Sequence, residues 1–120
     1  MNFPLKATFR LLIIAFCVIA STHDAVAQER MTRDEYIARW RHLAIDNMEV
    51  YGIPASITMA QALLESAAGN SELSKRSNNH FGIKCKSTWT GNRVYHDDDE
   101  KGECFRAYPT VEESYEDHAE

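Results

Sequence analysis

The sequence has 120 residues and a formal net charge of −5, with 44% hydrophobic and 26% charged residues. This length is sufficient for one small domain. An acidic domain lacks the basic face that nucleic acid or an anionic membrane surface requires, so both are excluded as partners.

Residues 1–27 have the pattern of a secretory signal peptide. Lys6 and Arg10 precede a short apolar run at 11–20, and small residues follow it. The run is shorter than the roughly 20 residues that a membrane-spanning helix needs. We therefore expect residues 1–27 to be removed on export, 28–31 to be a short linker, and no stable membrane anchor to remain. A buried core helix is the alternative.

The domain itself is expected over 32–120. Thr32 and Glu35 form a capping box at the start of a helix over 32–52, whose aromatic residues recur at helical spacing and are assigned to the core. A second helix is predicted over 53–69, between a proline in its first turn and a glycine at its exit.

The second predicted helix has an apolar arc that we expect to face the core. Thr58, Gln61 and Glu65 lie on the other side, and the small Ala62 and Ser66 beside them leave an open strip wide enough for a ligand. The arc comprises Ile57, Met59, Ala60, Leu63, Leu64, Ala67 and Ala68.

A small antiparallel β element is predicted over 81–108, where "FGIKCK", "RVY" and "ECFRAY" are rich in aromatic and β-branched residues. Cys85 and Cys104 remain after export as an even pair, which favours a disulfide. Free thiols are one alternative. A metal site with His80 and His96 is another, but its spacing matches no standard zinc pattern. No metal is predicted.

Another helix begins at Thr110, which forms a second capping box with Glu113. The sequence ends within this helix, so we expect an incomplete domain.

Three segments resemble, in order, the glucosaminidase domain of glycoside hydrolase family 73: "YGIPASITMAQALLESAAGNSELS", "NNHFGIKC" and "FRAYPTVEESYEDH". The resemblance covers about 50–120. It implies a lysozyme-like α+β fold with a helical lobe, a small β-lobe and a sugar-binding groove between them. It also implies cleavage of peptidoglycan glycan strands after N-acetylglucosamine, without metal or organic cofactor.

By this resemblance Glu65 is the catalytic acid. Its place near a helix C-terminus and the absence of a cation nearby in the sequence favour the protonated form that a proton donor needs. The residues expected to bind substrate are Gln61, Asn79, Phe81, Tyr95 and Tyr108.

Two alternatives to these substrate contacts are open. The aromatic residues, Trp89 included, pack in the core, or Asn79 caps a loop.

A glycosidase usually needs a second carboxylate opposite the acid. The segment "HDDDEKGE" offers five, of which Asp99 and Glu100 lie about where the family has its β-lobe carboxylate; we favour Glu100. A solvated acidic loop is the alternative. If the acetamido group of the substrate is the nucleophile, this carboxylate only orients it.

Other activities compete with this interpretation. A muramidase or lytic transglycosylase on the same fold and a non-catalytic wall-binding module remain open. A cysteine peptidase built on Cys85 and His80 is disfavoured because a disulfide would consume the thiol. A zinc amidase is disfavoured because no H-E-x-x-H sequence is present.

Overall fold

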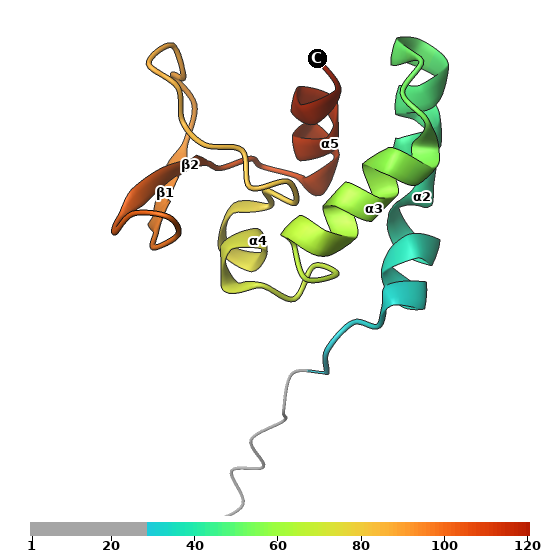
Figure 1. Ribbon diagram of the computed structural model, residues 1–120, viewed down its shortest axis with the longest axis horizontal. Coiled ribbons are helices and arrows are strands. Elements are labelled where there is room, and N and C mark those ends of the chain that lie inside the picture. The colour runs from blue at the N-terminus through green and yellow to red at the C-terminus, as the bar shows by residue number, and fades with distance from the viewer. Residues whose placement is uncertain (1–28) are drawn as a thin grey trace, which may run out of the picture.

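The computed structural model describes residues 29–120, so the predicted signal peptide and Gln28 lie outside the described residues. Figure 1 shows a helical part and a β-hairpin, with α5 standing between the hairpin and the α2–α3 pair. None of the helices between Glu29 and Glu120 has the length and apolar character needed to cross a membrane. The elements are α2 (Arg33–Tyr51), α3 (Ala55–Glu65), α4 (Glu72–Ser77), β1 (Arg93–His96), β2 (Glu103–Arg106) and α5 (Val111–Ala119).

The first described helix, α2, has the predicted capping box. The Thr32 hydroxyl accepts the Glu35 N–H at 3.2 Å, and the Glu35 carboxylate accepts the Thr32 N–H at 2.7 Å. Gly52 ends the helix in the left-handed conformation, with φ of 75°. The buried residues of α2 are Tyr36, Ala44 and Asn47, and they face α3 and α5.

The second helix ends earlier than the sequence predicts. It stops at Glu65, with Ser66 as its C-cap, because Ala67, Ala68 and Gly69 all have positive φ values of 51°, 54° and 73°. Two of these residues are alanines, which have no intrinsic preference for left-handed backbone. Tertiary contacts therefore decide where α3 ends.

The predicted facing of this helix is also partly wrong. Ile57 and Leu64 are 52% and 76% exposed, whereas Thr58, Ala62 and Ser66 are fully buried. The buried residues are small and recur every four positions, so they form a narrow stripe along which α3 packs on α2. The open strip that we expected beside Ala62 and Ser66 is therefore absent.

The β-hairpin pairs β1 with β2 in antiparallel register, with Tyr95 opposite Cys104. "FGIKCK" is not a strand: Lys84 makes a single bridge to Phe105, since the chain follows β2 only briefly. The predicted disulfide between Cys85 and Cys104 is confirmed and joins this segment to β2. It supports a sheet of only two strands, which is marginal on its own.

Candidate active site

Glu65 is the last residue of α3, and its carboxylate is exposed to solvent. Oε2 lies 3.4 Å from the position that a Cβ atom on Gly82 would occupy. Within residues 29–120 the carboxylate forms no ion pair, as expected from the sequence. The carboxylate thus lies close to the backbone of Gly82 and has no charged partner among the described residues.

The turn that follows Glu65 is held by polar side chains. The Ser66 hydroxyl donates to the Ala62 carbonyl at 2.6 Å and accepts the Gly69 N–H at 2.8 Å. The Asn70 amide donates to the Ala67 carbonyl at 2.9 Å. These bonds satisfy backbone groups that the end of a helix would otherwise leave unpaired.

Asn70 also fixes the segment that precedes α2. Its Oδ1 accepts the Met31 N–H at 2.9 Å, and its Nδ2 donates to the Met31 carbonyl at 2.8 Å. The backbone just before α2 is thus hydrogen-bonded to the turn that follows Glu65.

Asn79 is a loop cap, and this corrects its predicted contact with substrate. Its Nδ2 donates to the carbonyls of Ile83 and Arg106, each at 2.9 Å, and its Oδ1 accepts the Ile83 N–H at 3.0 Å. Asn79 is 1% exposed, so its amide is not accessible to a sugar.

Phe81 and Tyr108 also lie in the interior, not on a sugar-binding surface. The Phe81 ring stacks on His118 with centroids 3.9 Å apart and meets the edge of Tyr115. The Tyr108 hydroxyl donates to Asp117, and burial together with this carboxylate raises the pKa of Tyr108. Both residues therefore have structural contacts, and a contact of either with substrate stays a prediction.

Two predicted contacts do remain at the surface. Gln61 is exposed one turn before Glu65, and Tyr95 on β1 is 62% exposed. Trp89, in contrast, has the Arg106 guanidinium 4.6 Å from its ring centroid and lies close over Gly91. Of the aromatic residues weighed for sugar stacking, Tyr95 has the accessible ring.

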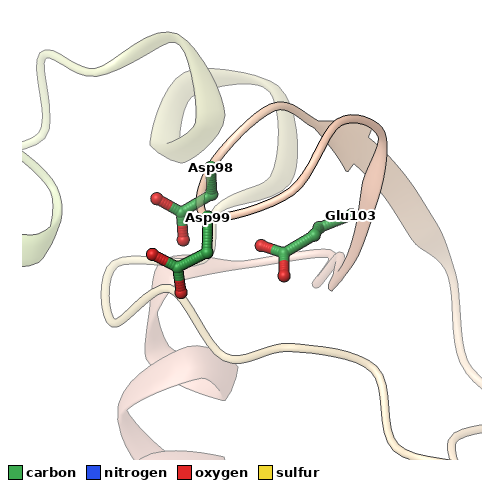
Figure 2. Close-up of side chains that lie close together, drawn as sticks. All are labelled: Asp98, Asp99 and Glu103. Carbon is green, nitrogen blue, oxygen red and sulfur yellow. The ribbon is translucent and has the colours of Figure 1, made fainter.

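Three acids of the hairpin surround one lysine. Lys84 Nζ lies 3.1 Å from Asp99 Oδ2, 3.1 Å from Glu103 Oε2 and 3.7 Å from Asp98 Oδ2. Figure 2 shows Asp98 and Asp99 side by side, with Glu103 extending toward them. Hydrogen bonds to Asp99 and Glu103 raise the pKa of Lys84, so its ammonium group supplies the positive charge that this cluster needs.

The other two acids of the hairpin differ from each other. Asp97 Oδ1 accepts the Gly102 N–H at 2.7 Å. The Glu100 carboxylate is exposed, and between residues 29 and 120 it forms neither a hydrogen bond nor an ion pair. Among the five hairpin acids, Glu100 is thus the one whose carboxylate is not engaged by the described part of the chain.

A buried hydrogen-bonded group next to this site escaped the sequence analysis. Tyr36 Oη lies 2.6 Å from His80 Nδ1 and 3.0 Å from Tyr115 Oη. Burial lowers the pKa of His80 to about 4, so the imidazole is neutral at physiological pH. Of these residues only Tyr36 was recognisable from the sequence, as part of the aromatic stripe of its helix. Cys85 lies in the disulfide, which contradicts the cysteine peptidase alternative.

A family model described as Glucosaminidase, mannosyl-glycoprotein endo-beta-N-acetylglucosaminidase, matches residues 41–120. The chain is 45% identical over 80 residues to the exo-glucosaminidase LytG of Bacillus subtilis (strain 168), covering 60% of this chain and 28% of LytG. It is 40% identical over 109 residues to an autolysin of Enterococcus faecalis, covering 83% of this chain and 14% of that protein. The chain therefore spans well under half of these relatives.

Solved structures give the same relationship. The peptidoglycan hydrolase from Sphingomonas sp. A1 superposes with a TM-score of 0.65 at 32% identity, over 73% of this chain and 59% of that chain. The catalytic domain of the autolysin Auto from Listeria monocytogenes has a TM-score of 0.60 at 32% identity, over 99% and 66% of the two chains. These matches confirm the predicted lysozyme-like α+β fold, of which the described residues form a part.

Proposed function

The chain belongs to the glucosaminidase family, and from this premise we propose that it is a peptidoglycan hydrolase that cleaves glycan strands as an endo-β-N-acetylglucosaminidase. The observation that carries the proposal is the position of Glu65. Its exposed carboxylate lies at a helix end against a glycine of the neighbouring loop, and no cation of the described residues neutralises it. A group so placed is available to a substrate.

In this mechanism Glu65 donates a proton to the oxygen of the glycosidic bond as that bond breaks. The positive charge that develops on the sugar ring is stabilised from the hairpin side, where Glu100 is the carboxylate without a partner in the described chain. If the acetamido group of the substrate attacks the anomeric carbon, Glu100 orients that group. Water completes the hydrolysis in both cases.

Substrate contacts are proposed for two exposed residues, Gln61 on α3 and Tyr95 on β1. Gln61 lies one turn before Glu65 on α3, where its amide can hydrogen-bond a sugar substituent. The exposed ring of Tyr95 offers a flat apolar surface to a sugar face. No residue in this mechanism requires a metal ion or an organic cofactor.

Peptidoglycan as substrate implies export, which we propose to proceed through the signal sequence at 1–27. The disulfide between Cys85 and Cys104 supports an oxidising compartment. Intact-mass analysis of exported protein should show Gln28 as its first residue. Exported protein that retains Met1 would exclude this route.

The decisive test is Glu65→Gln, which keeps the shape of the side chain and removes its titrating proton. We expect turnover on purified peptidoglycan to fall about a thousandfold, within the usual range for a general acid. Glu49→Gln is the matched control, because Glu49 is also a helical, exposed glutamate. If Glu65→Gln retained more than about a tenth of the activity, Glu65 would not be the acid.

Product analysis identifies the bond that is cut. Mass spectrometry should find N-acetylglucosamine at the new reducing ends of the glycan fragments. An anhydromuramic product would instead indicate a lytic transglycosylase, and release of single sugars would indicate exo cleavage. Binding to peptidoglycan without any cleavage would indicate a wall-binding module.

A further inference from the structure

The turn behind Glu65 has a backbone that its own sequence does not favour. Ala67 and Ala68 have φ values of 51° and 54°, a region that alanine adopts at a cost in free energy. Such conformations persist where surrounding structure enforces them. The contacts of this turn therefore show what holds Glu65 in place.

The turn packs on a buried pair of side chains, Tyr36 and His80. A Cβ atom on Gly69 would lie 3.3 Å from the Tyr36 ring and 3.6 Å from His80 Cε1, so the turn fits closely against both. Tyr36 and His80 are themselves joined by the 2.6 Å bond between Oη and Nδ1 and are 0% and 5% exposed. A well-packed, hydrogen-bonded pair is a rigid support.

One member of this pair, His80, also belongs to the loop that the Glu65 carboxylate faces. His80 is two residues before Gly82, against which Glu65 Oε2 lies. Tyr36 on α2 thus connects the turn that follows the acid with the loop that the acid faces.

We infer that Tyr36 and His80 are positioning residues for Glu65, acting through the Gly69 turn on one side and the Gly82 loop on the other. This inference rests on the proposed function of Glu65. Tyr115 bonds the Tyr36 hydroxyl at 3.0 Å, and its own hydroxyl is not part of the Tyr36–His80 bond, so we assign that hydroxyl to stabilising the pair.

The first test compares two glycines with the same backbone conformation. Gly69 and Gly52 have φ of 73° and 75°, but a Cβ on Gly52 would meet nothing within 4 Å. Both alanine variants carry similar backbone strain, and only Gly69→Ala presses on Tyr36. We expect Gly69→Ala to lower kcat about tenfold or more, with KM within about twofold, because small misplacements of a catalytic group are costly. Gly52→Ala should keep the wild-type kcat. Equal kcat values for the two variants would overturn the inference.

The second test separates the two hydroxyl groups. Tyr36→Phe keeps the ring that supports Gly69 and removes the bond to His80, whereas Tyr115→Phe leaves that bond in place. We expect Tyr36→Phe to lower kcat about tenfold and Tyr115→Phe to lower it less than about twofold. A purely structural role would lower the melting temperature of both variants and leave the kcat of the folded protein unchanged, which would also overturn the inference.

A spectroscopic readout keeps this test independent of turnover. The ¹³C signal of the Glu65 carboxyl group is assigned by its loss in Glu65→Gln and is then recorded in both phenylalanine variants. It should shift in Tyr36→Phe and stay in place in Tyr115→Phe. If the wild-type chain cleaves no glycan, the proposed function fails, and the carboxyl signal still decides the positioning. An unchanged signal in Tyr36→Phe would contradict it.

Discussion

The two sides of the site are stabilised in different ways. Behind Glu65 the support is buried and neutral: Tyr36, His80 and Tyr115 are each no more than 5% exposed and are joined by short hydrogen bonds. The hairpin with Glu100 depends on an exposed ionic cluster and one covalent link. Buried neutral bonds are insensitive to salt, whereas exposed ion pairs are screened by it. We therefore expect the surroundings of Glu65 to respond less to salt than those of Glu100.

The largest expected effect concerns the covalent link of the hairpin. Replacing both Cys85 and Cys104 by alanine should lower the free energy of unfolding by about 3 kcal/mol, because the crosslink no longer restricts the entropy of the unfolded chain. Urea denaturation of the variant and of the reduced wild-type protein measures this difference. Amide hydrogen exchange should rise in β1 and β2 more than in the turn behind Glu65. Equal increases in both regions would contradict the comparison.

The next effect separates the acids of the hairpin. Glu100→Gln should lower turnover about a hundredfold, as is usual for a general acid–base group, while Asp99→Asn should change it less than about threefold. The reason is that Asp99 is already paired with Lys84, whereas Glu100 has no partner in the described chain. Rates on purified peptidoglycan measure both.

Lys84→Met is the control for this pair of variants. It releases the lysine-bound acids without altering Glu100, so turnover should remain within about threefold of wild type. A hundredfold loss in Asp99→Asn with Glu100→Gln unaffected would reverse the assignment. If neither variant loses activity while Glu65→Gln is inactive, assistance by the acetamido group of the substrate is the better mechanism.

A smaller expected effect is the pH dependence of stability that arises from the buried, neutral His80. Burial lowers the pKa of His80 from 6.5 to about 4, so the unfolded chain binds a proton that the folded chain excludes between these values. Stability must therefore fall as the pH falls through this range, by about 2 kcal/mol between pH 6.5 and 5. Urea denaturation at the two pH values measures the loss.

Protonation of other acids also contributes over this pH range, so variants isolate the part of His80. His80→Gln should remove about 2 kcal/mol of the pH dependence, whereas His42→Gln, at an exposed position of α2, should leave it unchanged. The same pH dependence in all three proteins would show that the His80 site does not exclude the proton.

Local sequence signals predicted most of the elements. The Thr32–Glu35 capping box, the glycine after α2 and the helix that begins after Thr110 all appear where the sequence indicates them. The disulfide followed from an even pair of cysteines in a chain that we expect to be exported. These features depend on neighbouring residues or on composition, which a single sequence displays directly.

The misses arise where tertiary contacts override local preference. Hydropathy assigned Leu64 to the core and Ser66 to the surface, whereas packing against α2 selects the small side chain and leaves Leu64 exposed. The end of α3 was missed because alanine does not signal left-handed backbone. In the sequence, an asparagine that caps a loop looks the same as one that binds a sugar. Only the hydrogen bonds of the buried Asn79 amide to the backbone identify it as a cap.

The two hydrogen bonds between Asn70 and Met31 have a practical consequence for fusion proteins. The backbone of Met31 lies next to the turn that follows Glu65. Figure 1 shows the end of α5 at the opposite end of the described chain. An affinity tag or fluorescent carrier fused directly ahead of Met31 would be held beside this turn and, with Glu65 as the proposed acid, would crowd a polymeric substrate. The same cargo attached after Glu120 would be held away from that turn.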